Sequence, residues 1–406
     1  APDIVHESAG HAPILADPDY AAFLQRAGEL GFRAIASAED DAVYEAIRAL
    51  SVAKEDPAAT PAEVAEAEER LAAASAARRY VSEATRASRL YWWTAEYGLV
   101  GPLDAPRIYG AGLLSSIGES THCFSREVER LPLDVRAAEV EYDITRMQPQ
   151  LFVVRELSEL SAVVDDLART LSWRRGGDGG LAEARRARTV NHLVLADGTA
   201  ISGRVAQTFE GPRPAAPGLA TALCVLAGPT QLARPGKPAP PSELPAVVAF
   251  GGGARGPAEG SFCLAFETGL GLSGRIAGGV ATELRASLGS RELPVPARAL
   301  LAASRALPSV SGGPADPAAW DARFGAPPRD GAAEARARTH KAEALDARVG
   351  DLYREVRRMR EGGATDRRRL LAIAREVEED GGEWLLREEV RELMAGEAVA
   401  GRAVQS

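Results

Sequence analysis

The amino-acid sequence predicts an α+β protein with a mainly helical first part, a small β-rich module and a helical carboxy-terminal segment. Three observations support this division. Apolar residues recur at helical spacing before residue 172, an Asp-Gly turn between apolar runs predicts a β-hairpin after residue 188, and apolar residues three or four apart return after residue 332. We expect residues 1–172, a linker 173–187, a β-rich module 188–306, a linker 307–331 and a helical segment 332–406.

Capping residues locate the helices of the first part. Asp17-Pro18 is typical of a helix start, and Gly31 is typical of a helix end. A second helix is expected over residues 40–53. Thr60-Pro61-Ala62-Glu63 then has the layout of a capping box with proline at the first helical position. Residues 37–88 are therefore expected to form a helical hairpin.

Two histidines near the start and one later glutamate form a candidate metal-ligand set. His6, His11 and Glu96 supply the two imidazoles and one carboxylate that bind iron(II) on one side and leave open positions on the other. A spacing of five places the histidines about 140° apart on an α-helix, so a straight helix cannot aim both at one ion. We expect the helix to end or distort near Gly10, before Pro13, with His11 just past its end. On these residues alone, two histidines of structural role remain the simpler interpretation.

Three blocks of sequence, in order, resemble the pterin-dependent aromatic amino acid hydroxylases, the phenylalanine hydroxylase family. They are Pro2 to Pro13, Tyr91 to Leu99 and Ile108 to Glu119, and Leu151 to Val154 resembles the strand that closes the family's catalytic domain. The resemblance covers residues 1 to about 172. It implies a mainly helical iron-hydroxylase catalytic domain in which residues 37–88 are an insertion, interpreted as added structure and not as a new function.

The resemblance implies a role for each matched residue around the metal. His6, His11 and Glu96 would bind iron(II). Ser115 would orient His6, because a ligating imidazole needs its other nitrogen held. Without the resemblance, Ser115 would be an ordinary turn residue.

The same resemblance implies sites for a cofactor and a substrate. Glu7 would face a tetrahydropterin and Tyr91 would flank it, so Glu7 and Ser115 are the candidate catalytic residues. The expected lining of the pocket for the aromatic amino acid is Pro2, Trp92, Gly112 and Ser115. Trp93, on the same helix as Trp92, is interpreted as a core residue.

The implied activity is that of an iron(II)- and tetrahydropterin-dependent monooxygenase that uses O2 to hydroxylate a free aromatic amino acid. Phenylalanine, converted to tyrosine, is the expected substrate on family frequency alone. Family members carry, ahead of the His-Glu block, a segment with the pterin loop and an arginine for the substrate carboxylate. The sequence begins after this segment, so we expect either a longer natural chain or its loss. The alternative is a non-catalytic iron-binding or scaffold homologue whose appended modules mediate interactions.

Composition argues against several classes of protein. No run of about 18 apolar residues occurs and the first residues lack a signal-peptide layout, so we expect no membrane span and a cytoplasmic location. A formal charge of -9 argues against nucleic acid as a partner. Cys123, Cys224 and Cys263 are too far apart for a zinc motif or a disulfide framework and are expected to be buried.

The β-rich module is expected to be a small barrel or sandwich. A hairpin over residues 192–205 turns at Asp197-Gly198, and further strands are expected at 222–226, 246–250, 261–266 and 272–276. Gly251 to Gly256 matches a dinucleotide-binding fingerprint, but Pro257 and a strand follow in place of a helix, so a wide glycine turn is favoured.

Apolar residues after residue 332 predict a helical hairpin. They are Leu345, Val349, Leu352, Val356, Met359, Leu370, Ile373, Val377, Trp384, Leu385, Val390 and Leu393. This hairpin is expected to pack on the β module or on another subunit, which would make a homo-oligomer.

Overall fold

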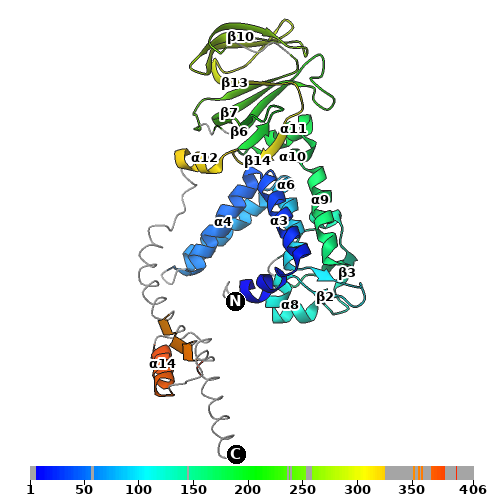
Figure 1. The fold of residues 1–406 in the computed structure, drawn as a ribbon, viewed down its shortest axis with the longest axis vertical. Helices are drawn as coiled ribbons and strands as arrows, with labels where there is room; N and C mark the ends of the chain where they lie inside the picture. Colours follow the sequence, from blue (N-terminus) through cyan, green and yellow to red (C-terminus); the bar gives the residue numbers. More distant parts are fainter. Residues whose placement is uncertain are drawn as a thin grey trace, which may run out of the picture. The chain divides into compact units, whose positions relative to one another are not determined.

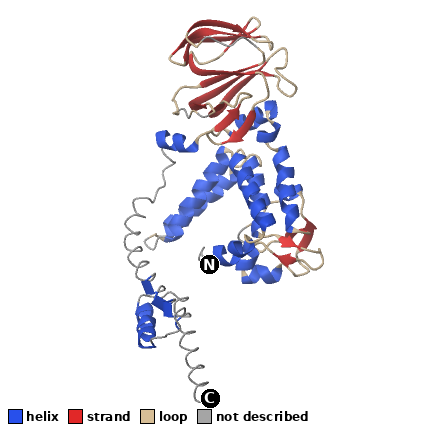
Figure 2. Cartoon of the chain, in the orientation of Figure 1, coloured by secondary structure: helices blue, strands red, loops and turns tan. Residues whose placement is uncertain are grey.

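The computed structural model describes residues 6–55, 59–143, 146–235, 237, 240–252, 258–324 and parts of 351–390. The chain divides into two compact units, residues 1–325 and 326–406. Helices and sheets are both present (Figure 1), which confirms the α+β class. Figure 2 shows that helices dominate the part before the β-rich module.

Helices begin where the capping residues predict them, but the expected end at Gly31 is wrong, because α3 continues through it to Arg33. The bounds are α3 (Pro18–Arg33), α4 (Ala38–Glu55), α5 (Pro61–Ala76) and α6 (Glu83–Tyr91). The Asp17 side chain accepts hydrogen bonds from the backbone N–H groups of Asp19 and Tyr20 at the start of α3. Thr60 and Glu63 form the predicted capping box at the start of α5. Helices α4 and α5 pack together as a hairpin, as expected for residues 37–88.

A small sheet and α9 (Leu160–Thr170) complete the first part. The sheet has the order β2 (Arg107–Ile108), β1 (Leu99–Val100), β4 (Gln150–Val154) and β3 (Glu129–Pro132). Strand β4 is the strand that the family resemblance identified, and Leu151 to Val154 are buried. Its side chains join α3, α6 and α9 in one hydrophobic core with Trp93 at 0% exposure, so the core interpretation of Trp93 is confirmed.

The segment 173–187, expected as a linker, is helical. It contains α10 (Ser172–Arg175) and α11 (Gly177–Ala187). The glycines that suggested a linker serve close packing: Gly176 and Gly177 turn the chain at φ of 59° and 60°, and a side chain at Gly180 would meet Val310. The linker prediction is therefore wrong, because glycine is common both in flexible linkers and where a helix packs closely against its neighbours.

A buried carboxylate ties these helices to the first part. Glu83 accepts hydrogen bonds from the backbone N–H and the hydroxyl of Ser172, both at 2.7 Å, and from the N–H of Ile35 at 3.2 Å. Burial raises the pKa of Glu83, although the hydrogen bonds from Ser172 and Ile35 oppose this. One side chain thus joins three segments that are far apart in sequence.

The β-rich module is a single open sheet of ten strands. The order is β14 (Ser309–Gly312), β5 (Asn191–Val194), β6 (Ala200–Glu210), β7 (Thr221–Ala233), β8 (Ala246–Phe250), β13 (Arg298–Ser304), β11 (Val280–Leu288), β10 (Leu270–Ala277) and β9 (Gly260–Ala265), with β12 (Arg291–Leu293) paired to β11. Residues 221–226 of β7 and all of β8 are buried on both faces, and the two faces contribute to different hydrophobic clusters. The strands described here do not close into a barrel, because β14 and β9 remain the ends of the sheet.

The predicted hairpin is correct, and the four later strands form at or near their expected positions as parts of β7, β8, β9 and β10. Strands β11, β12 and β13 were not expected. Gly251 lies in a turn at φ 104°, and the next described element is β9 and not a helix, which fits the glycine-turn interpretation. Residues 253–257 lie outside the described part.

The segment 307–331 also differs from the expected linker. Strand β14 pairs antiparallel with β5, and α12 (Pro317–Phe324) follows. Backbone at Gly312 lies so close to Ala34 that a side chain would overlap the Ala34 backbone. The chain returns to the end of α3 here, a long-range contact that local composition does not encode.

In the second unit, the described residues form α14 (Arg367–Glu379) and shorter helical pieces. Leu352, Val356, Leu370, Ile373 and Val390 form one cluster, with Met359 packed against it. Leu345, Val349, Trp384, Leu385 and Leu393 lie outside the described residues, so the hairpin and its role in oligomers remain predictions.

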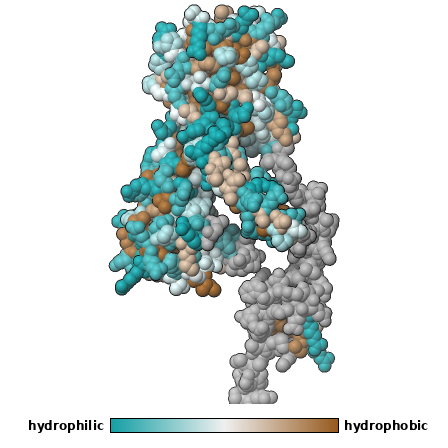
Figure 3. Space-filling model, turned by 180° about the vertical axis from the view of Figure 1, so that it is seen from behind, coloured by the Kyte–Doolittle hydropathy of each residue, from teal (hydrophilic) through white to brown (hydrophobic). Residues whose placement is uncertain are grey.

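Surface features complete the description. Searched over the described residues, no helix is long and apolar enough to cross a membrane. On the face shown in Figure 3, hydrophilic and hydrophobic residues are intermixed. Cys123 and Cys224 are buried as expected, but the expectation is wrong for Cys263, which is exposed because its side chain alternates away from the core-facing residues of β9.

Candidate metal centre

The two histidines lie on one turn of π-helix. Residues Glu7–His11 form η1, and the N–H of Ala12 bonds to the carbonyl of Glu7, five residues earlier. Because a π-turn stacks residues five apart, it brings His6 and His11 to the same side. The predicted distortion is confirmed, but His11 does not lie past the helix end: α2 (Ala12–Ile14) follows directly, with Pro13 in its first turn.

A second π-turn carries the carboxylate. Residues Trp92–Glu96 form η2 at the end of α6, and the N–H of Tyr97 bonds to the carbonyl of Trp92 at 2.8 Å. The buried hydroxyl of Thr94 donates to the carbonyl of Leu90 at 2.6 Å, which satisfies a backbone group where the helix changes pitch. Glu96 thus projects from the last turn of a helix, as expected from the sequence.

The three side chains converge. His6 Nε2 lies 3.4 Å from one carboxylate oxygen of Glu96, and His11 Nε2 lies 3.1 Å from the other. All three ligand atoms lie within 4.8 Å of one another. Ligands bound at about 2.0–2.2 Å and at right angles around one ion are about 3 Å apart, so the separation of each histidine from Glu96 suits neighbouring positions of an octahedral ion.

Ser115 fixes the orientation of His6. The Ser115 hydroxyl lies 2.8 Å from His6 Nδ1 and donates its single hydrogen to the carbonyl of Ala111 at 2.9 Å. It must therefore accept from Nδ1–H, which leaves the lone pair of Nε2 directed at Glu96. The side chains are partly shielded from water, with exposures of 29% for His6, 11% for His11 and 16% for Glu96. The donor set and the held tautomer fit a divalent metal ion.

Comparison with known proteins supports the same assignment. Residues 60–175, which include Glu96 and Ser115, match the family described as biopterin-dependent aromatic amino acid hydroxylase. The chain is 31% identical to phenylalanine-4-hydroxylase of Dictyostelium discoideum over 39% of this chain and 26% of that protein. It is 31% identical to the Vibrio cholerae phenylalanine-4-hydroxylase over 44% of this chain and 47% of that protein. Human tyrosine 3-monooxygenase is 30% identical over 39% of this chain and 22% of that protein.

Over residues 60–175 the chain is thus similar to the aromatic amino acid hydroxylase family. The chain spans about a quarter to a half of the length of these relatives. Among solved structures, the cold-active phenylalanine hydroxylase of Colwellia psychrerythraea is 27% identical over 42% of this chain and 50% of that chain, with a TM-score of 0.28.

Close backbone packing holds the two π-turns of the candidate metal centre together. A side chain at Gly10 would come 2.8 Å from the Cβ of Ala111, at the start of α7 (Ala111–Ser115). Gly112 likewise lies against Tyr97 and the carbonyl of Glu96, where an added Cβ would be 2.8 Å from the Tyr97 ring. Helix α7 therefore contacts both π-turns, and Gly112, assigned from the sequence to a pocket wall, also has a packing role. Sequence reasoning did not assign a role to Gly10 beyond the helix distortion.

Glu7 and Tyr91, both assigned to the pterin by resemblance, lie near the metal centre. Burial raises the pKa of Tyr91, and the negative charges of Glu96 and Glu7 raise it further. Glu7 is the first residue of η1. Its side chain is exposed and does not belong to the group formed by His6, His11 and Glu96. Pro2 lies outside the described residues.

Trp92 is covered on both faces. Its ring stacks on Tyr97 at 4.4 Å and on Tyr142 at 4.2 Å, measured between ring centroids. Only an edge of this indole is left to line a pocket, which narrows the substrate role expected for Trp92. The stack ties η2 to the segment before residue 144, and sequence reasoning did not single out Tyr97 or Tyr142.

Tyr20 is a second residue that sequence reasoning treated only as part of an apolar stripe. Its side chain is fully buried, and its hydroxyl has no hydrogen-bond partner among the described residues. Burial raises the pKa of Tyr20 well above its ordinary value, with further contributions from Tyr91 and Glu96. The Tyr20 hydroxyl is thus an unpaired buried donor close enough to the carboxylate ligand to sense its charge.

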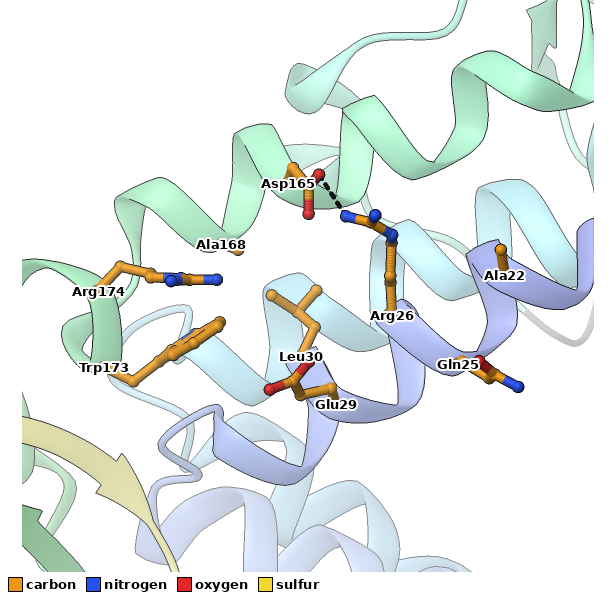
Figure 4. A pocket seen from close by; sticks show the side chains of 9 residues that line it. All are labelled: Ala22, Gln25, Arg26, Glu29, Leu30, Asp165, Ala168, Trp173 and Arg174. Carbon is orange, nitrogen blue, oxygen red and sulfur yellow. Dashed lines mark hydrogen bonds and ion pairs between the residues drawn. The ribbon is translucent and has the colours of Figure 1, made fainter. Parts of the chain in front are cut away.

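A separate cleft of about 470 Å³ lies between α3 and α9 (Figure 4). Arg26 forms an ion pair with Asp165 across it at 2.6 Å, and the Trp173 ring at one end contacts the guanidinium groups of Arg33 and Arg174. Its charged lining residues are two acidic and two basic. Because these charges cancel, the lining attracts neither cations nor anions. We interpret the cleft as a gap in the packing between α3 and α9.

Proposed function

We propose that this protein is an iron(II)- and tetrahydropterin-dependent monooxygenase that hydroxylates a free aromatic amino acid, with phenylalanine as the substrate. The observation that carries the proposal is the convergence of His6, His11 and Glu96 within 4.8 Å on two π-turns, with His6 Nδ1 held by Ser115. Two imidazoles and one carboxylate with open positions are the ligand set of non-haem iron oxygenases. The relatives named phenylalanine-4-hydroxylase support the substrate class.

The residues of this chain would divide the work. His6, His11 and Glu96 would hold iron(II) from one side, and Ser115 would keep Nε2 of His6 aimed at the ion. Iron and a reduced pterin would supply the activation of O2. Glu7 and Tyr91 would border the pterin. No side chain is required as a nucleophile.

Substrate binding would fall to the remaining predicted residues. Gly112 and the edge of Trp92 would border the ring of the amino acid, with Ser115 between the pocket and the metal ligand. The tight stack of Trp92 between Tyr97 and Tyr142 would keep this wall rigid.

A pair of substitutions tests the assigned roles. Glu96→Gln keeps the shape of the side chain but removes the charge that balances iron(II), so metal affinity and hydroxylation should both fall. Glu7→Gln should leave metal affinity near wild type and lower hydroxylation coupled to pterin oxidation. Metal affinity is measured by titration of the purified protein, and hydroxylation by the amount of product formed with reduced pterin and phenylalanine. Equal loss of metal in both variants would make Glu7 a candidate ligand and refute this division of roles.

The alternative from the sequence is a non-catalytic iron-binding scaffold. It predicts the same loss of metal in Glu96→Gln, but no ring hydroxylation by the iron-loaded protein supplied with reduced pterin and any of the aromatic amino acids. That outcome would replace the monooxygenase proposal.

A further inference from the structure

Tyr20 of α3 carries a hydroxyl group in the core of the first part. The side chain is fully buried, and its hydroxyl has no hydrogen-bond partner in the described part of the chain. A phenylalanine, such as Phe23 in the same helix and the same hydrophobic cluster, would fill this position without burying a polar atom. Buried polar groups in native proteins are almost always paired, so the Tyr20 hydroxyl is expected to have a partner in the working protein.

The surroundings of Tyr20 lead to Glu96. The Tyr20 ring packs edge-on against the ring of Tyr109, with the ring centroids 6.0 Å apart. Tyr109 lies against Gly98, and the neighbouring Gly110 lies against the backbone carbonyl of Glu96. Burial raises the pKa of Tyr20, and the negative charge of Glu96 raises it further, as expected for two groups that are close in space.

The carboxylate of Glu96 needs a hydrogen-bond donor when it binds a metal ion. Its two oxygens lie 3.4 Å from Nε2 of His6 and 3.1 Å from Nε2 of His11. With an ion bound, both Nε2 atoms are ligands and cannot donate to Glu96. Glu96 offers one oxygen to the ligand set, so its second oxygen is left without these neighbours as donors. In a site that is largely shielded from water, this oxygen needs a donor from the protein.

We propose that the Tyr20 hydroxyl donates a hydrogen bond to the oxygen of Glu96 that does not bind the metal. Tyr20 is then a positioning residue, because it holds the carboxylate with its other oxygen on the ion, as Ser115 holds the ring of His6. The proposal gives the buried hydroxyl a partner and the carboxylate a donor. It rests on the proposed metal centre and adds to it a contact from α3, a helix that carries none of the three ligands.

The test is the affinity of the purified protein for nickel(II), measured by competition against a chelator of known affinity. Nickel(II) binds nitrogen and oxygen ligands more tightly than iron(II), so weakened variants remain measurable. Tyr20→Phe removes only the hydroxyl and should weaken nickel(II) binding about tenfold. Urea unfolding of the metal-free variant should match that of wild type, which separates a loss of positioning from a loss of packing. Wild-type nickel(II) affinity in Tyr20→Phe would overturn the proposal.

Tyr142→Phe is the matched control. It also removes one tyrosine hydroxyl, which lies 3.3 Å from Oγ of Ser88, and it keeps the ring that stacks on Trp92. Nickel(II) affinity should therefore stay at the wild-type value. A loss equal to that of Tyr20→Phe would show that any missing hydroxyl in this part disturbs the metal centre, and the specific role of Tyr20 would be wrong.

A double-mutant cycle with Glu96→Gln shows whether Tyr20 acts through the carboxylate. In the Glu96→Gln background, Tyr20→Phe should weaken nickel(II) binding by less than about twofold, because the charged acceptor is already gone. A full tenfold loss in that background would overturn the proposal, while leaving the metal centre intact. Failure of the wild-type protein to bind nickel(II) would instead refute the metal centre, and the role of Tyr20 with it.

Discussion

Replacement of Ser115 by alanine isolates the contribution of one hydroxyl to the metal centre. The hydroxyl accepts from His6 Nδ1 at 2.8 Å and donates to the carbonyl of Ala111 at 2.9 Å. Loss of such a partner of a metal-bound histidine typically lowers metal affinity by about 10- to 100-fold, or about 1.4–2.8 kcal/mol. Because His6 is 29% exposed, water can replace part of the lost bond, so we expect the lower end, about tenfold.

Ser116 provides the matched control. It is the N-cap of α8 (Ile117–His122), where its hydroxyl accepts a hydrogen bond from the N–H of Glu119 and not from His6. Ser116→Ala should lower the free energy of unfolding by about 1 kcal/mol and leave metal affinity unchanged.

The assay is competition for cobalt(II) or iron(II) against a chelator of known affinity, with urea unfolding of the metal-free proteins alongside. Two results would refute the reasoning about the Ser115 hydroxyl. One is wild-type metal affinity in Ser115→Ala, and the other is an equal loss of affinity in Ser116→Ala.

Three further predictions concern packing, an unpaired hydroxyl and a buried acid. Gly10→Ala should lower the free energy of unfolding by about 1–3 kcal/mol, because the new methyl group overlaps α7. Gly28→Ala, which points into open space on α3, should raise it by up to about 1 kcal/mol. Equal changes in the free energy of unfolding by urea would contradict this prediction. Tyr20→Phe should leave the stability of the metal-free protein unchanged or slightly higher, because the hydroxyl that it removes has no described hydrogen-bond partner. A decrease of more than about 1 kcal/mol in the free energy of thermal unfolding would show that the hydroxyl has a partner. Burial raises the folded-state pKa of Glu83, so its contribution to stability is complete below the ordinary carboxyl pKa and declines as the pH rises through the raised value. Glu83→Gln should remove this decline, and it should also lower stability at every pH because one hydrogen bond is lost. An unchanged dependence of stability on pH in this variant would contradict the prediction.

The sequence determined the chemistry of the candidate metal centre. Residue type permits an iron(II) ligand set at His6, His11 and Glu96, and the resemblance to the hydroxylase family singled this set out. The spacing of five between the two histidines required a departure from the α-helix. The sequence also predicted the helix caps at Asp17 and Thr60 and the turn at Asp197-Gly198. Each of these features depends on hydrogen bonds or dihedral angles within a few residues.

The tertiary structure decided what depends on contacts between distant residues. Nothing near Gly176 or Gly180 in sequence says that these glycines meet Pro308 and Val310, so they resembled a linker although they belong to packed helices. Which face of β9 packs against distant strands, and so which face leaves Cys263 exposed, depends on tertiary contacts. The lack of a described partner for the Tyr20 hydroxyl likewise follows from its burial. Local patterns encode local hydrogen bonds, whereas close approach, burial and cavity shape arise from the whole chain and are absent from any short window of it.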